Sequence, residues 1–209
     1  MKIALLYGIF GAGKTSMIRY LAEHLEKKYQ KKVGLIIYEE GKVKIEDDRF
    51  PLKILPKGCL PCETAVYFGQ SLVDLYTEEE PDIVMIEPSG TTLPRIILSA
   101  ITYAGDDAGE KFDFSPTLNV VDPVTLKIFW KTLKGVVENG IRESDYVVIN
   151  KIDTALEGDI GKAERIIREV EPKARVLHTS SVTCERLKEA SKILVKQVSE
   201  KYGVVAGET

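Results

Sequence analysis

The stretch Gly8-Ile9-Phe10-Gly11-Ala12-Gly13-Lys14-Thr15 decides the fold of this chain. It has the spacing of a phosphate-binding loop, in which a glycine is followed, after four residues, by Gly-Lys-Thr. Residues 3–7 before it are apolar, and residues 16–28 after it have amphipathic helical spacing, so the expected context is strand, loop and helix. We predict a loop that binds a nucleoside triphosphate, and not a glycine-rich turn that happens to carry a lysine.

Each part of the predicted loop has a separate task. The glycines allow backbone N–H groups to turn toward a phosphate chain, and the following helix adds the positive end of its dipole. Lys14 is expected to place its charge at the β- and γ-phosphates, and the Thr15 hydroxyl to hold Mg²⁺. The residues expected to contact the nucleotide here are Gly11, Ala12, Gly13, Lys14, Thr15 and Ser16.

The composition favours one globular domain in a reducing compartment. The chain has 209 residues, of which 44% are hydrophobic and 29% charged, and its net charge is −3. These values give no electrostatic reason to expect nucleic acid or an anionic membrane as a partner. No apolar run reaches the roughly 18 residues of a membrane span, and the three cysteines do not form an even disulfide set. We expect a cytoplasmic domain over residues 1–203 and a frayed tail over 204–209.

Apolar runs alternate with amphipathic stretches along the whole chain. The expected strands are 3–7, 33–38, 52–55, 83–86, 117–121, 146–149 and 175–178, and the expected helices are 16–28, 65–76, 93–104, 124–133, 163–170 and 187–198. Most of the strands are continuously apolar, which is typical of strands that are buried on both faces. The alternation therefore predicts an α/β fold with a parallel sheet covered by helices on both sides.

A second motif, Asn150-Lys151-Ile152-Asp153, directly follows a predicted strand. Ligands of open α/β sheets bind at the carboxyl ends of the strands. A carboxylate there can accept two hydrogen bonds from the N1–H and amino edge of guanine, whereas adenine would leave it unpaired. We therefore expect Asp153 to select guanine, Asn150 to bridge to the phosphate loop and the Lys151 stem to lie over the base, although such a sequence also makes a good turn. Residues 179–182 follow the last strand, and Ser180 and Ser181 are weaker candidates for a base contact.

With these motifs the sequence resembles SIMIBI-class P-loop GTPases of the family that contains CobW, UreG and HypB, which are metallochaperone GTPases. Glu87-Pro88-Ser89-Gly90 fits the Glu-x-x-Gly motif of that family, and Tyr38-Glu39-Glu40-Gly41 keeps the glutamate and glycine of its Asn-Glu-Phe-Gly motif. The resemblance implies a three-layer P-loop NTPase fold, with a mostly parallel central sheet covered by helices on both faces. It also implies that Glu39 and Glu87 lie near Mg²⁺ with Thr15, and that Gly90 contacts the nucleotide. On residues alone, the less favoured alternatives are a solvated loop charge for Glu39 and a helix-entry residue for Glu87.

The family also places a cysteine motif between the two acids, where this chain has Gly58-Cys59-Leu60-Pro61-Cys62. Two thiolates at this spacing form half of a site for Zn²⁺, Ni²⁺ or Co²⁺, and a two-fold dimer would complete it. A redox pair and two structural cysteines remain alternatives. Cys184 is a poorer metal candidate, and both His24 and His178 are expected to be structural.

The expected function is a GTPase switch that delivers a metal or assists maturation of a metallocofactor enzyme. No arginine finger or water-positioning glutamine is recognisable, so intrinsic hydrolysis of GTP to GDP and phosphate should be slow. The expected partners are GTP or GDP, a client metalloenzyme or its accessory protein, and a second copy of the chain in the metal- or GTP-bound form. The alternatives are a nucleotide-dependent chaperone that gates a corrinoid enzyme without binding metal, and a small-molecule kinase with the same phosphate loop.

Overall fold

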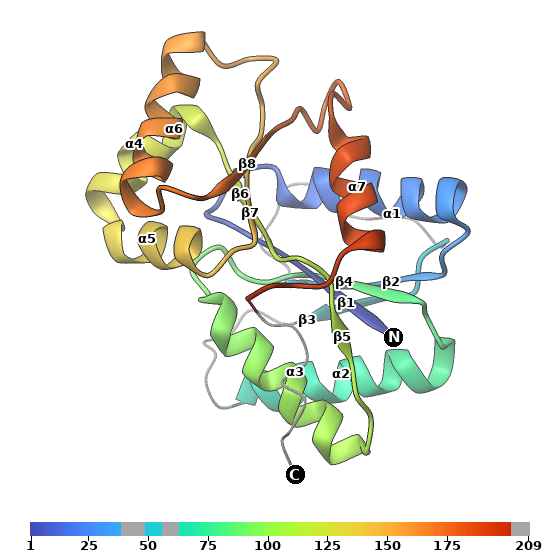
Figure 1. Cartoon of the computed structure of the whole chain (residues 1–209). Coiled ribbons are helices and arrows are strands. Elements are labelled where there is room, and N and C mark those ends of the chain that lie inside the picture. The colour runs from blue at the N-terminus through green and yellow to red at the C-terminus, as the bar shows by residue number, and fades with distance from the viewer. Residues whose placement is uncertain (39–48, 56–62, 202–209) are drawn as a thin grey trace.

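The structure is a computed structural model of the 209-residue chain, and it describes residues 1–38, 49–55 and 63–201. The strands are β1 (Lys2–Tyr7), β2 (Val33–Tyr38), β3 (Leu52–Leu55), β4 (Ile83–Glu87), β5 (Asp113–Phe114), β6 (Leu118–Val121), β7 (Tyr146–Ile149) and β8 (Arg175–His178). The helices are α1 (Lys14–Tyr29), α2 (Glu63–Glu79), α3 (Pro94–Ala108), α4 (Pro123–Thr132), α5 (Lys134–Arg142), α6 (Glu157–Val170) and α7 (Leu187–Lys196) (Figure 1).

The strands form one sheet in the order β3-β2-β4-β1-β6-β7-β8, with β5 paired to β1. Every strand pair in the described part of the chain is parallel. Strand β1 is central because Lys2–Leu5 pair with β4 and the end of the strand, Leu6–Tyr7, pairs with β6. The chain order therefore reverses its direction across the sheet next to β1, which is where open α/β sheets bind ligands.

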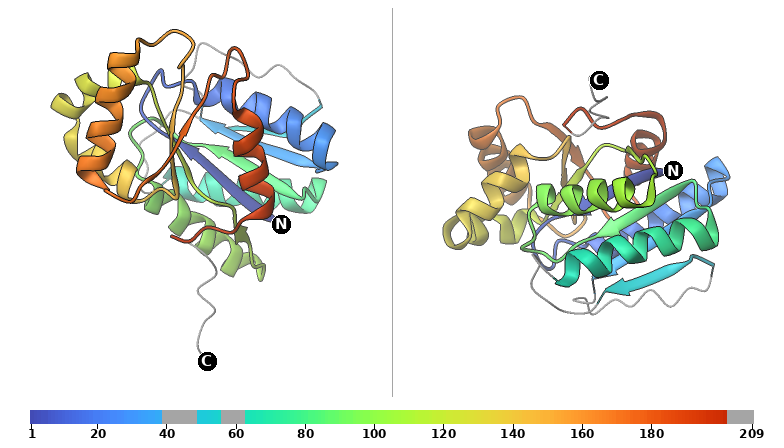
Figure 2. Two further views of the ribbon diagram at one scale, coloured as in Figure 1. Left: turned by 45° about the horizontal axis from the view of Figure 1, so that its top comes forward. Right: turned by 90° about the horizontal axis from the view of Figure 1, so that it is seen from below.

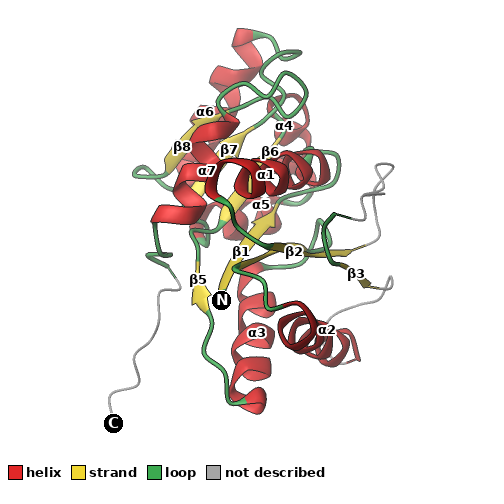
Figure 3. Ribbon diagram, turned by 90° about the vertical axis from the view of Figure 1, so that its right-hand side faces the viewer, coloured by secondary structure: helices red, strands yellow, loops and turns green. Residues whose placement is uncertain are grey.

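Helices cover both faces of the sheet, as Figures 2 and 3 show. Helices α1 and α7 pack on one face, while α2 and α3 lie side by side on the other. Helices α4, α5 and α6 cover that second face at its β6–β8 end. This arrangement confirms the predicted parallel α/β fold with three layers.

Strand β1 shows why its sequence is apolar throughout. Ala4 and Leu6 face the cluster under α1 and α7, while Ile3, Leu5 and Tyr7 face the cluster under α2 and α3. All five side chains are at most 2% exposed. A strand in the middle of such a sheet has no solvent face, so alternation of polar and apolar residues would leave polar groups buried without partners.

Three local expectations are corrected. Residues 134–142 form helix α5, and Asp113–Phe114 adds a short strand; neither element was expected from the sequence. Helix α7 ends at Lys196, so Val198 lies beyond it and is half exposed. The glycines of α5 weaken its helical signal, but Gly140 packs beside Asn119, and its carbonyl accepts a hydrogen bond from the Tyr7 hydroxyl. In α5, these tertiary contacts outweigh the low helix propensity of the glycines.

None of the helices within residues 1–38, 49–55 and 63–201 combines the length and the apolar character needed to cross a membrane. Glu39, Cys59 and Cys62 lie outside the described residues, as does the tail predicted for 204–209.

Candidate functional site

The phosphate loop joins β1 to α1 in a conformation that only glycine adopts easily. Gly8, Gly11 and Gly13 have φ values of 140°, 76° and 92°. A Cβ atom at Gly8 would lie 2.0 Å from the Val120 carbonyl oxygen, which closes that position to every other residue. Helix α1 starts at Lys14 with no side-chain cap and no acidic residue in its first turn, so no carboxylate of the helix itself competes for its first N–H groups.

Lys14 and Thr15 meet Glu87 at the end of β4. The Thr15 hydroxyl donates a hydrogen bond to Glu87 Oε1 at 2.9 Å, and Lys14 Nζ lies 3.9 Å from the same oxygen. Both charged side chains are less than a tenth exposed. Strand pairing explains the meeting, because β1 and β4 are parallel neighbours and both end at the same edge of the sheet.

The Glu87 carboxyl is poorly solvated. Burial raises the pKa of Glu87 above its ordinary value, against the opposing effects of the Lys14 charge and the Thr15 hydrogen bond. Its second oxygen, Oε2, is buried and has no hydrogen-bond partner among the residues that the structure describes. A carboxylate oxygen without a partner beside a threonine hydroxyl is a fitting donor set for Mg²⁺, which prefers hard oxygen ligands.

Asn150 ties three loops together at the carboxyl edge. Its side-chain amide donates to the Ala12 carbonyl at 2.9 Å. Its Oδ1 accepts from the Ser181 N–H at 2.9 Å, the Ser181 hydroxyl at 3.0 Å and the Thr179 hydroxyl at 3.3 Å. The residue is completely buried. The bridge expected between Asn150 and the phosphate loop is therefore present.

The other residues of the second motif lie around this bridge. Lys151 has a φ of 60° and its Nζ donates to Asp122 Oδ2 at 2.9 Å. Asp153 is exposed. Ser180 is buried, and its hydroxyl accepts hydrogen bonds from the N–H groups of Val182 and Thr183, so its side chain shapes the loop after β8.

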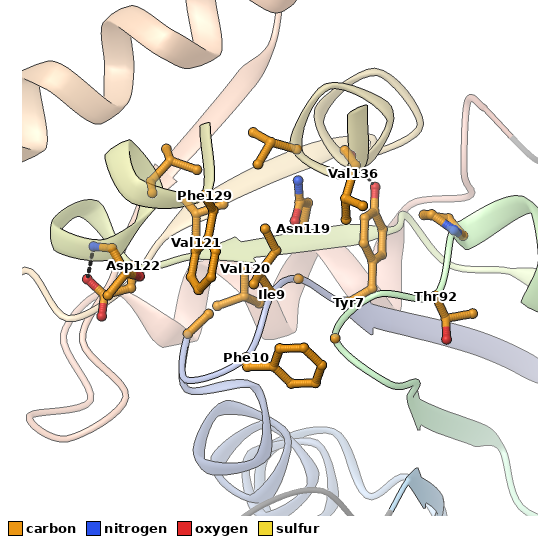
Figure 4. A pocket seen from close by; sticks show the side chains of 18 of the residues that line it. Tyr7, Ile9, Phe10, Thr92, Asn119, Val120, Val121, Asp122, Phe129 and Val136 are labelled. Carbon is orange, nitrogen blue, oxygen red and sulfur yellow. Dashed lines mark hydrogen bonds between the residues drawn. The ribbon is translucent and has the colours of Figure 1, made fainter. Parts of the chain in front are cut away.

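Gly90 lies against the phosphate loop from the other side. A Cβ there would come within 2.8 Å of the Phe10 nitrogen and ring, so the backbone of the 87–90 segment touches the backbone of the phosphate loop. Phe10 also borders a narrow apolar crevice between this segment, β6 and helices α4 and α5 (Figure 4). The crevice has a cavity volume of about 30 Å³.

Sequence reasoning missed Asp122. The signal was present, because Asp122-Pro123 directly follows a buried strand, and Asp before Pro is a typical helix start. Its carboxylate caps α4 and also holds Lys151.

The two histidines have partners that support a structural role. His24 stacks on Tyr20 with ring centroids 5.8 Å apart, and His178 Nε2 lies 2.8 Å from Glu164 Oε1. In the described ranges no group of three or more His, Cys, Asp or Glu side chains could hold a metal ion.

These features define the class of the protein. A glycine-rich loop between a central strand and a helix, with a lysine, a threonine and a buried acid converging below it, marks a nucleotide-binding protein with a phosphate loop. Residues 2–178 match the family model described as CobW/HypB/UreG, nucleotide-binding domain. The chain belongs to this family.

Individual relatives agree with this assignment. The chain is 29% identical over 154 residues to the "Zinc chaperone YeiR" of Escherichia coli (strain K12), a match that covers 71% of this chain and 46% of the relative. The chain thus spans about half of that protein. The hydrogenase maturation factor HypB of Archaeoglobus fulgidus has the same fold, with a TM-score of 0.66 at 18% identity over 93% of this chain and 88% of the other. The structure of HypB from Helicobacter pylori in complex with nickel has a TM-score of 0.63 at 18% identity. The match covers 92% of this chain and 84% of the other.

Proposed function

We propose that this chain is a guanine-nucleotide switch that hydrolyses GTP and links its nucleotide state to the handling of a thiophilic metal ion for a client metalloenzyme. The observation that carries the first part is the convergence of Lys14 and Thr15 on the buried Glu87. Membership of the CobW/HypB/UreG family supports it. GTP hydrolysis, the metal and the client are all proposals for this chain.

At the phosphate end of the site, the Lys14 ammonium group and the oxygen atoms of Thr15 and Glu87 would have different roles. Lys14 would place its charge on the β- and γ-phosphates, while N–H groups of residues 11–16 donate to their oxygens. Thr15 and Glu87, joined by Glu39 on the strength of the resemblance, would hold Mg²⁺. When bound, the ion would offset the negative charge of the triphosphate. Glu87 Oε2 is the oxygen that the described residues leave without a hydrogen bond.

The base end of the site would select guanine. Asp153 is exposed, so its carboxylate is free to accept hydrogen bonds from the N1–H and amino groups of the base. Asn150 fixes the loop that carries Asp153 to the Ala12 carbonyl, so the base and phosphate halves keep their spacing. Ser181 donates to Asn150 and completes this support. The same contact restrains the loop of residues 179–182, the weaker candidate for a base contact.

Phosphate release without an added acceptor tests the enzymatic part. With Mg²⁺ present, GTP should be hydrolysed slowly and ATP much more slowly. Lys14→Ala should remove hydrolysis and most triphosphate affinity, and Thr15→Ala should weaken chiefly the Mg²⁺-dependent part of binding. Lys27→Ala is the matched control, because Lys27 lies on the same helix, its side chain is exposed, and its ion pair in the described structure is with Glu23. Equal hydrolysis of ATP and GTP would contradict the proposal.

The metal part rests on Cys59 and Cys62, which the sequence places between β3 and α2. The similarity to YeiR, a zinc chaperone, and to the nickel-bound HypB structure supports a metal-handling role. Zn²⁺ prefers four ligands, so a two-fold dimer sharing one ion through four thiolates is the expected form. If the cysteine loop senses the γ-phosphate, GTP and GDP should give different metal affinities, and metal should change nucleotide affinity by the same factor.

Zn²⁺ titration under reducing conditions, followed by light scattering, tests this part. One ion per dimer is expected, and Cys59→Ser or Cys62→Ser should abolish both the metal and the dimer. Cys184→Ser is the matched control, since Cys184 is exposed beyond β8. A monomer that takes up no Zn²⁺ with either nucleotide would remove the metal from the proposal and leave a GTPase switch.

A further inference from the structure

Asp122 makes two kinds of contact with one carboxylate. Its Oδ1 caps helix α4 by accepting from the N–H groups of Val124 and Thr125, at 2.8 and 3.4 Å. Its Oδ2 accepts from Lys151 Nζ at 2.9 Å. The Asp122 side chain is 8% exposed and that of Lys151 is 37% exposed. The carboxylate is therefore fixed by the helix, and the lysine head is fixed by the carboxylate.

The sheet explains why these two residues meet. Strands β6 and β7 are parallel, with Val121 opposite Ile149, and the Asn150 N–H continues the pairing by donating to the Val121 carbonyl at 2.9 Å. Asp122 and Lys151 are then the next residues to leave the sheet. Figure 4 shows Asp122 at one end of the crevice, where β6 passes into α4. The contact between Asp122 and Lys151 therefore follows from the register of β6 against β7.

The Lys151 side chain also runs beside the phosphate loop. A Cβ built at Gly13 would lie 3.9 Å from Lys151 Cε, so the lysine stem passes the glycine that precedes α1. At its other end the Lys151 carbonyl accepts from the N–H groups of Thr154 and Ala155, at 3.2 and 3.1 Å. The backbone turn holds one end of this side chain and Asp122 holds the other.

We propose that Asp122 is a positioning residue for nucleotide recognition, which acts by holding the Lys151 stem over the site of the guanine base. The inference rests on the guanine-nucleotide function proposed above. A lysine side chain that is free before binding loses rotamer freedom when a ligand orders it, and this loss of entropy weakens binding. Because Asp122 already orders Lys151, nucleotide binding incurs little of this entropy loss. GTP and GDP carry the same guanine base, so positioning of Lys151 over the base should strengthen the binding of both by the same factor.

A double-mutant cycle on Asp122 and Lys151 tests the positioning role. Asp122→Asn and Asp122→Ser remove the charge but keep an oxygen that can cap α4. Each should weaken GDP and GTP binding by the same factor, about tenfold, with the thermal midpoint close to that of wild type. Lys151→Met should cause a similar loss. Adding Asp122→Asn to Lys151→Met should cause no further loss, because the lysine that Asp122 positions is already gone.

The control breaks another ion pair of the same helix. Lys127 on α4 pairs with Asp159 on α6 at 3.3 Å, so Asp159→Asn should leave both affinities unchanged. The proposal is overturned if the Asp122 variants bind GDP as tightly as wild type, or if their losses add to that of Lys151→Met, as a purely structural role would require. Wild-type protein that binds ADP as tightly as GDP would instead overturn the guanine site itself.

Discussion

At Gly13 the phosphate loop approaches Asn150 so closely that a methyl group has no room. A Cβ there would lie 2.5 Å from Asn150 Nδ2, whereas a Cβ at Gly11 would meet no heavy atom within 4 Å. Both glycines have positive φ, so alanine should cost about 1 kcal/mol of strain at either position. Gly13→Ala must also displace the Asn150 bridge, and we expect a total loss of roughly 3 kcal/mol. Urea unfolding of the two variants checks this, and equal destabilisation would contradict the contact.

Glu87 gives a prediction about pH. Because burial raises its pKa in the folded protein, the folded chain binds this proton more tightly than the unfolded chain. The associated stability is present at low pH and is lost as the pH rises through the folded-state pKa. Glu87→Gln does not ionise, so its advantage over wild type should grow with pH. Unfolding free energies measured without Mg²⁺ or nucleotide, between about pH 5 and 8, check this; a difference that does not change with pH would refute it.

Asn150 links the phosphate loop to the loop after β8. It makes four side-chain hydrogen bonds, to Ala12, Thr179 and Ser181. Asn150→Ala should therefore reduce the free energy of unfolding by about 2–4 kcal/mol, and should weaken nucleotide binding because the two halves of the site lose their fixed spacing. Asn139→Ala, on α5, is the control and should change little. Calorimetry of both variants would contradict this link if they bound nucleotide equally well.

The elements differ in how far the sequence predicts them. The β1 and β4 strands are continuous apolar runs, each followed directly by a motif, so their existence and position follow from residues 3–7 and 83–86. Helix α5 does not follow, because Gly135 and Gly140 lower its propensity and its buried face, Val137 and Ile141, is recognisable only once β6 and β7 are in place. Local sequence patterns predict the strands and helices with a strong signal, whereas helices with a weak signal, such as α5, depend on tertiary contacts.

The candidate site follows the same rule. Lys14, Thr15 and Asn150 were predicted because each belongs to a motif with a required position, and the structure brings Thr15 to Glu87 and Asn150 to the phosphate loop. The pairing of Asp122 with Lys151 depends on the register of β6 against β7, which no local pattern contains. The roles of Glu39, Cys59 and Cys62 stay predictions, because these residues lie outside the described part of the chain.

For the whole molecule, the topology places the site. Strands β1, β4, β6, β7 and β8 are parallel, so their carboxyl ends share one edge, and the residues that follow them form a single surface. The phosphate and base motifs are separated by more than a hundred residues in sequence, yet the hydrogen bond between Asn150 and Ala12 joins them. A guanine nucleotide spanning both motifs is the central claim.

Calorimetric titration of wild type and Asp153→Asn with GDP, ADP and xanthosine diphosphate tests this claim most directly. Wild type should bind GDP far more tightly than ADP, because adenine would leave the Asp153 carboxylate unpaired. Asp153→Asn places an amide donor against the donor edge of guanine, so GDP binding should fall. Xanthosine diphosphate, with a carbonyl at that edge, should become the better ligand. Equal binding of GDP and ADP by wild type, or an Asp153→Asn variant that still prefers GDP, would contradict the account.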